Sequence, residues 1–167
     1  LATIVESVDP VAVVTDRADD RRIGDARRVG VAGASAAADV DVTTTIDRVR
    51  RRVEAIGTSA TAYVIATSGS TGRPRGVGVS HANLAASTFA RQHTYTDTPE
   101  RFLLTSSIGF DSSVVGLFWP LVAGGTVVVA SDEDVRDVDR LAAIAQRSKV
   151  THVLMVPSLY RAMLARR

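Results

Sequence analysis

The chain contains no cysteine, so it can form neither a disulfide nor a thiolate metal site. Lys149 is its only lysine, and nearly all of its positive charge is therefore carried by arginine. The formal net charge of +2 gives little support for a nucleic-acid partner. Its longest apolar run, residues 118–130, is too short to span a bilayer and contains Pro120 and two glycines. No charged and then apolar leader opens the sequence, so we expect a cytoplasmic chain with neither nucleic acid nor membrane as a partner.

A length of 167 residues suits one domain, or one lobe of a larger one, and allows a substantial core. The chain begins at Leu1 inside an apparent amphipathic helix over residues 1–8. It ends on a helical pattern that has no glycine stop. These two ends lead us to expect a piece of a larger protein.

Runs rich in β-branched residues alternate with amphipathic segments along the chain. They predict strands at residues 11–16, 28–33, 61–67, 76–80, 101–107, 126–130 and 151–157. Helical spacing predicts helices at residues 46–56, 81–93, 112–123 and 137–149, and from Ser158 onward. Strand and helix alternate strictly from residue 101, which predicts an α/β fold with a largely parallel sheet flanked by helices.

The segment TSGSTGRPRG, residues 67–76, follows an apolar strand and consists of small, hydroxylated and cationic residues. It could be a plain hairpin turn, because glycine, serine and threonine dominate turns. It could equally be an anion site, because backbone N–H groups of such a loop can converge on phosphate oxygens while Arg75 supplies charge. The spacing fits neither a Walker A loop nor the dinucleotide-binding fingerprint.

Asp111 stands between Phe110 and an apolar helical segment, where a buried carboxylate is costly unless it is paired. One interpretation is a helix N-cap that accepts hydrogen bonds from the N–H groups of Ser113 or Val114. The other is a functional acid. The three histidines show no metal-binding spacing, so we predict no metal site within this segment.

Residues 62–84, AYVIATSGSTGRPRGVGVSHANL, closely resemble the phosphate-loop motif of the adenylate-forming superfamily, which includes acyl-CoA synthetases, luciferases and adenylation domains of nonribosomal peptide synthetases. Arg75 stands where that family usually has lysine, so charge is kept while shape and reach differ. The resemblance implies that the phosphates of ATP are bound by Thr67, Ser68, Gly69, Ser70, Thr71, Gly72 and Arg75.

Residues 106–130, SSIGFDSSVVGLFWPLVAGGTVVVA, resemble the FDxS core of amino-acid-activating domains. In that family the acid faces the substrate pocket and pairs with the ammonium of the amino acid, a role that falls on Asp111. The same resemblance implies that Ser112, Val115 and Leu154 line the pocket, although Val115 and Leu154 could also be ordinary core. Acyl-CoA synthetases usually lack this acid.

Taken as a whole, residues 1–167 resemble part of the N-terminal subdomain of an adenylation domain. The implied reaction activates an amino acid with ATP and Mg²⁺ and loads it onto the phosphopantetheine thiol of a peptidyl carrier protein, in the setting of antibiotic and other secondary metabolism. The remainder of the adenylation domain, and a condensation domain, are further implied partners. No catalytic residue is assigned, and the segment alone is expected to be inactive. The alternatives are an acyl- or aryl-CoA ligase, or a degenerate domain that acts as a scaffold.

Overall fold

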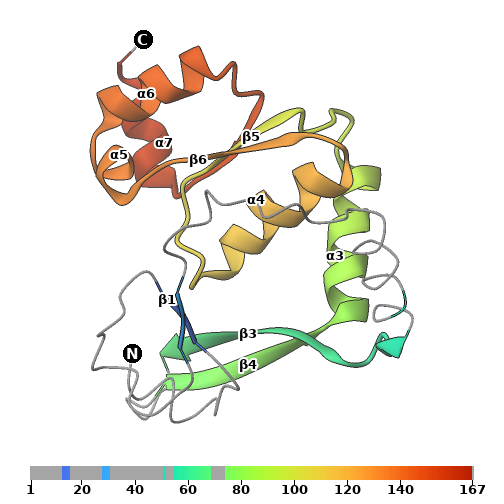
Figure 1. Ribbon diagram of the computed structural model, residues 1–167. Helices are drawn as coiled ribbons and strands as arrows, with labels where there is room; N and C mark the ends of the chain where they lie inside the picture. The colour runs from blue at the N-terminus through green and yellow to red at the C-terminus, as the bar shows by residue number, and fades with distance from the viewer. Residues whose placement is uncertain (1–12, 16–27, 31–50, 52–54, 69–73, 167) are drawn as a thin grey trace, which may run out of the picture. The chain divides into compact units, whose positions relative to one another are not determined.

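The computed structural model describes residues 13–15, 28–30, 51, 55–68 and 74–166 (Figure 1). They fall into two compact units, Leu1–His81 and Ala82–Arg167. The helix predicted at residues 1–8, and most of the one at 46–56, lie outside the described residues. Within the described ranges, no helix has the length and apolar character needed to cross a membrane.

The first unit contains two pairs of strands. The pairs are parallel β1 (Val13–Thr15) with β2 (Arg28–Gly30), and antiparallel β3 (Thr61–Ser68) with β4 (Pro74–Ser80). The strands predicted on either side of the glycine-rich segment are therefore confirmed, and they form a hairpin (Figure 1). It forms because β-branched and aromatic residues flank a segment of small turn-forming residues.

The second unit has the predicted alternation of strands and helices. Its elements are α3 (His81–Thr94), which begins in the first unit, β5 (Arg101–Leu104), α4 (Asp111–Val122), β6 (Thr126–Val129), α5 (Asp132–Arg136), α6 (Val138–Arg147), β7 (His152–Leu154) and α7 (Pro157–Leu164). The strands form a parallel sheet in the order β6-β5-β7. The α/β fold class with a parallel sheet flanked by helices is thereby confirmed, and the strands are shorter than predicted.

The central strand β5 is buried on both faces. On one face Leu103 packs with Leu141 and Ile144, and α7 contributes Leu159 and Met163 to the same cluster. Successive side chains of a strand point to opposite faces, so Phe102 and Leu104 face α4 on the other side. The result is three layers, with α4 on one face of the sheet and α6 and α7 on the other (Figure 1). Burial of each such side chain contributes roughly 1.5–3 kcal/mol.

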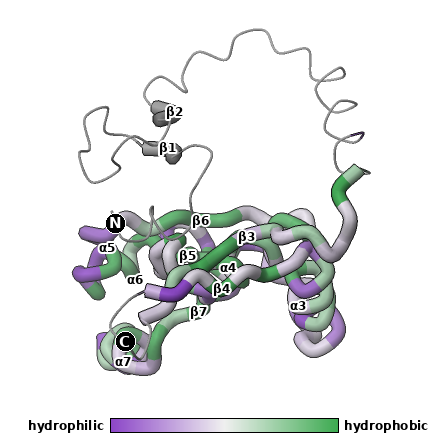
Figure 2. The backbone as a smooth tube through the Cα atoms, turned by 90° about the horizontal axis from the view of Figure 1, so that it is seen from below, coloured by the Kyte–Doolittle hydropathy of each residue, from purple (hydrophilic) through white to green (hydrophobic). Residues whose placement is uncertain are grey.

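Hydropathy follows these layers within the second unit. In Figure 2, β5 and β6 carry the colour of hydrophobic residues, and α5 is largely hydrophilic. Strands covered on both faces are expected to be continuously apolar. A short helix at the surface can instead be charged throughout.

The end of α4 explains the glycine pair that follows it. Gly124 has φ +79, the left-handed conformation that glycine adopts without strain. The N–H of Gly125 donates to the carbonyl of Pro120 at 2.7 Å, and the N–H of Gly124 donates to Leu121 at 3.2 Å. This is the Schellman pattern, which satisfies the last carbonyls of the helix and turns the chain into β6.

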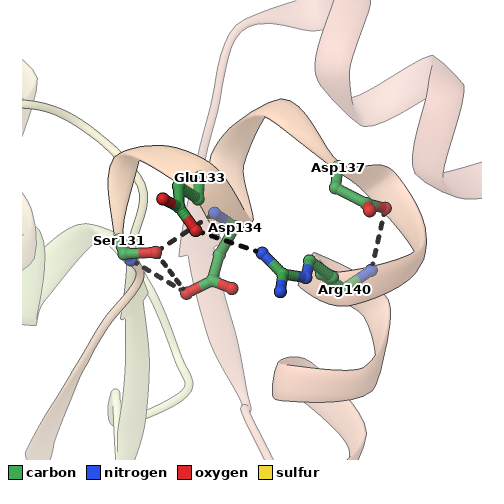
Figure 3. A network of polar contacts seen from close by, with 5 residues as sticks. All are labelled: Ser131, Glu133, Asp134, Asp137 and Arg140. Carbon is green, nitrogen blue, oxygen red and sulfur yellow. Dashed lines mark hydrogen bonds and ion pairs between the residues drawn. The ribbon is translucent and has the colours of Figure 1, made fainter.

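A network of polar contacts connects α5 and α6 (Figure 3). Ser131 and Asp134 form a capping box at the start of α5, in which the Ser131 hydroxyl accepts from the Asp134 N–H at 3.2 Å. The Asp137 carboxylate caps α6 by accepting from the N–H groups of Asp139 and Arg140 at 3.0 and 3.2 Å. Asp137, where a helix was predicted to begin, thus lies at the positive end of α6, whereas α5 was not predicted.

The same network perturbs one carboxyl group. The Ser131 side chain, followed by the Ser131 backbone N–H, donates to the Asp134 carboxylate and lowers its pKa. Arg140 lies 3.4 Å from the carboxylate of Glu133, which adds an exposed ion pair between the two helices.

Candidate functional site

The carboxyl edge of the sheet brings together the ends of β5 and β7, which are neighbouring parallel strands. The chain leaves β5 towards α4 on one face and leaves β7 towards α7 on the other. In open parallel sheets, ligands bind beyond the carboxyl ends of strands whose connections diverge in this way. Asp111 follows β5 and Leu154 ends β7, so this edge holds predicted residues from segments far apart in the sequence.

Side-chain hydroxyls fasten the loop between β5 and α4. The Ser112 hydroxyl donates to that of Ser106 at 2.9 Å, and the Ser113 hydroxyl donates to the Phe110 carbonyl at 2.6 Å. At the end of β5, the Thr105 hydroxyl donates to the Leu154 carbonyl at 3.2 Å and so joins the two strand ends. These contacts fix where α4 begins.

Asp111 is the first residue of α4, so of the two interpretations the N-cap is wrong. Phe110 occupies the N-cap position with extended backbone (φ −111, ψ 147), and no side chain caps the helix. The N-cap position precedes the first helical residue and falls on Phe110, whose side chain has no acceptor to offer. Asp111 is also exposed, so the expectation of a buried carboxylate is corrected as well.

The carboxylate of Asp111 is available to accept a partner. It lies in the first turn, where the helix dipole stabilises negative charge. Among the described residues no hydrogen bond or ion pair occupies its carboxylate.

The other predicted pocket residues lie on α4 and at the end of β7. Val115 comes one helical turn after Asp111 on the same side of α4 and is half-buried, as is Ser112. Leu154 is 40% exposed at the end of β7. Further along that side of α4, Phe118 and Val122 are also exposed, so this side does not face the sheet.

The hairpin of the first unit presents the other predicted group. Thr67 pairs with Arg75 across the two strands, so both side chains project from the same face. The Thr67 hydroxyl donates to the Arg75 carbonyl at 3.3 Å. Ser68 pairs with Pro74 one position on, and its side chain projects from the opposite face.

Four predicted phosphate-binding residues, Gly69, Ser70, Thr71 and Gly72, lie outside the described residues. The described ones form two groups, with Thr67, Ser68 and Arg75 in the first unit and Asp111, Ser112, Val115 and Leu154 in the second.

Residues with positioning roles were not found from the sequence. Thr105, Ser106 and Ser113 hold the β5–α4 loop, and the signal for them is the run of hydroxylated residues on both sides of Phe110. No group of three or more acidic, histidine or cysteine side chains that could hold a metal is found in the part of the chain that the structure describes.

Comparisons with known proteins agree with this architecture. The family of AMP-binding enzymes matches residues 1–167. A plipastatin synthase of Bacillus subtilis is 42% identical over 104 residues, which are 62% of this chain and 4% of that protein. Tyrocidine synthase 3 of Brevibacillus parabrevis is 37% identical over 117 residues, 69% of this chain and 2% of that protein. The chain thus spans a small fraction of the length of these relatives.

Solved structures share the fold. A nonribosomal peptide synthetase, FmoA3, crystallised with AMPPNP bound, matches with a TM-score of 0.74 at 26% identity, over 99% of this chain and 17% of that one. The o-succinylbenzoate CoA synthetase of Bacillus subtilis matches with a TM-score of 0.70 at 20% identity, over 99% of this chain and 42% of that one, which is a likeness of fold alone. With the family match extending over residues 1–167, the chain belongs to the AMP-binding enzymes.

Proposed function

We propose that residues 1–167 form part of the N-terminal subdomain of an adenylation domain that activates an amino acid in nonribosomal peptide synthesis. The observation that carries the amino-acid assignment is Asp111, a carboxylate in the first turn of α4 at the carboxyl edge of the sheet, with no partner among the described residues. An α- or β-amino acid offers an ammonium group to such an acid, and the acyl substrates of CoA ligases do not.

In the proposed reaction, a carboxylate oxygen of the amino acid attacks the α-phosphorus of ATP. A new oxygen–phosphorus bond forms, the bond to the β-phosphate bridge breaks, and its electron pair leaves with pyrophosphate. Two anions must approach each other, so the protein contributes positioning and compensation of charge. The thiol of a carrier-protein phosphopantetheine then takes the aminoacyl group and releases AMP.

The proposed role of each residue follows from the chemistry of its side chain. Thr67 and Arg75 share one face of the hairpin, so the hydroxyl and the guanidinium can both reach the β- and γ-phosphates. Ser68, Gly69, Ser70, Thr71 and Gly72 complete the proposed phosphate loop. Asp111 orients the ammonium, while Ser112, Val115 and Leu154 line the side-chain pocket. The described residues offer no cluster of metal ligands, so Mg²⁺ is assigned no ligand and no step here.

The test is ATP–pyrophosphate exchange in the complete enzyme that contains this chain, screened against amino acids. We expect Arg75→Ala to lower exchange about tenfold or more, because one charge-assisted contact to the leaving phosphates is lost. Arg75→Lys, which introduces the residue usual in the family, should retain most of the activity. Arg136→Ala on α5 is the matched control, since it removes an exposed arginine outside the site.

Asp111→Asn tests the substrate class. Exchange with the cognate amino acid should fall about tenfold or more, mainly through KM for the amino acid, whereas Asp132→Asn should leave it unchanged. Full exchange in Asp111→Asn would refute the ammonium contact.

Adenylation of a carboxylic acid that lacks an amine, with transfer to coenzyme A, would assign an acyl- or aryl-CoA ligase instead. No exchange with any acid would indicate a scaffold. The proposed cytoplasmic location can be checked by fractionation.

A further inference from the structure

A small hollow of about 230 Å³ lies at the amino edge of the sheet in the second unit, the edge opposite Asp111 and Leu154. It is formed where the end of α3 and the segment leading into β5 meet the end of α4. Its lining residues are Gln92, Tyr95, Thr96, Asp97, Thr98, Pro99, Trp119 and Ala123. The volume is below the roughly 300–1,000 Å³ of pockets for drug-sized ligands, so only a small group fits.

Aromatic rings form one wall of the hollow. Tyr95 and Trp119 lie with their ring centroids 5.2 Å apart and tilted by 37°. Trp119 is only 6% exposed and is held from behind by edge-on contacts to Phe102 and His152, at 6.2 and 5.5 Å. Tyr95 is 56% exposed, so its ring packs against the buried Trp119 and is still accessible to a ligand.

The charge of the lining is negative. Asp97 is exposed and, of the described residues that line the hollow, is the only charged one. Within the described residues its carboxylate has no ion pair or hydrogen bond. The hydroxyls of Thr96 and Thr98 are further polar groups of the lining that can accept hydrogen bonds.

The backbone around the hollow is closely packed. The Gly125 Cα lies so near the chain before β5 that an added Cβ would sit 2.2 Å from the Pro99 carbonyl oxygen. The Thr126 N–H donates to the Glu100 carbonyl at 2.8 Å. Pro99, which lines the hollow, is therefore closely packed against Gly125.

We propose that this hollow binds a monoalkylammonium group, held between the Asp97 carboxylate and the face of the Tyr95 ring. A carboxylate attracts the ammonium, the electron-rich ring face stabilises it by a cation–π contact, and the apolar ring surface accepts the alkyl stem. Such a group can come from a free amine or from the lysine side chain of another protein. The site is independent of the proposed adenylation, because none of its residues belongs to the candidate functional site.

The single tryptophan of the chain makes the test direct. The indole Nε1 of Trp119 is buried and has no hydrogen-bond partner in the described part of the structure, so its one N–H resonance reports on the hollow without overlap. The ¹⁵N-labelled chain is titrated with n-butylammonium and with Nα-acetyl-lysine methylamide at constant pH and ionic strength. We expect a saturable shift, and the stronger of the two ligands identifies the source of the head group.

Substitutions at Asp97 and Tyr95 distinguish the contribution of the carboxylate charge to binding from that of the aromatic ring. Asp97→Asn and Tyr95→Leu should each weaken binding about fivefold or more, while Tyr95→Phe and the matched control Asp132→Asn should leave it unchanged. Far-UV circular dichroism verifies that each variant is folded. Neutral 1-butanol binding as tightly as n-butylammonium, undiminished binding to Asp97→Asn, or no saturable shift up to about 100 mM would each overturn the proposal.

Discussion

At the scale of single residues, Gly116 marks the closest approach of α4 to the sheet. A Cβ at this position would lie 2.8 Å from the Leu104 Cδ1 and 2.9 Å from the Phe102 Cε1. Leu104 could shift its terminal methyl, but the Phe102 ring is 2% exposed and is packed against Trp119. The absence of a side chain at Gly116 therefore sets the position of the helix that carries Asp111.

Gly116→Ala is predicted to destabilise the second unit. Overpacking costs roughly 1–3 kcal/mol, and replacing a glycine inside a helix returns about 1 kcal/mol, so we expect a net loss of about 1 kcal/mol. Urea unfolding followed by Trp119 fluorescence measures it. Gly57→Ala is the control, because a Cβ there would meet no described atom nearer than the Ser59 hydroxyl oxygen, at 3.8 Å. Equal or higher stability of Gly116→Ala would contradict the close packing.

The backbone conformation of Lys149 could not be predicted from the identity of its side chain. It has φ +48 directly after the cap of α6, and the N–H of Val150 donates to the Ala145 carbonyl at 2.9 Å. This is the position at which helices usually carry glycine. The sequence indicates a charged residue on a helix, whereas the backbone uses it to end that helix in a conformation that lysine rarely adopts.

At the scale of elements, the capping box of α5 is expected to be sensitive to pH. The pKa of Asp134 is lowered from its ordinary value of 3.8 because Ser131 hydrogen-bonds the charged carboxylate. The contribution to stability is therefore fully present above pH 3.8 and is lost as the pH falls through the lower folded value. In Ser131→Ala the Asp134 carboxyl should titrate closer to its ordinary value.

An NMR titration of the Asp134 side-chain carbon measures this shift. Ser158→Ala, which removes an exposed serine in the first turn of α7, is the matched control and should leave the titration of Asp134 unchanged. An identical curve for Ser131→Ala and the unsubstituted chain would show that the serine does not stabilise the carboxylate.

Elements with a strong pattern were predictable, and their boundaries were not. The hairpin and the parallel sheet follow from β-branched runs separated by turn residues, and Leu141 and Ile144 follow from helical spacing. The predicted start of α4 was wrong. The loop before this helix is held by hydrogen bonds of Ser106 and Ser113, and no rule of residue spacing identifies such contacts. The last helix begins at Pro157, not Ser158, since proline suits the first helical position.

At the scale of the whole molecule, the predicted site is divided between two compact units. Thr67 and Arg75 belong to one, and Asp111 and Leu154 belong to the other. The sequence could assign these residues by resemblance, because each motif is local. It could not give their mutual geometry, since that depends on how separate cores pack, and local periodicity contains no such information.

The second unit has its own core, so residues 80–167 are predicted to fold without the rest of the chain. Leu103, Leu141 and Ile144 pack on one face of β5, and α4 covers the other face, and these elements all belong to this range. Trp119 is the only tryptophan, so its fluorescence reports this unit in both the fragment and the full chain. We expect one cooperative urea transition, with midpoints that agree between the two.

Phe102→Ala in the same fragment is the informative control. Removing a ring that is 2% exposed should cost about 3–5 kcal/mol and abolish or strongly shift the transition. If the unsubstituted fragment unfolded without cooperativity while the full chain kept a sharp transition, the core around β5 would depend on residues of the first unit. A retained transition in the fragment would instead show that the segment carrying Asp111 reaches its structure from local sequence alone.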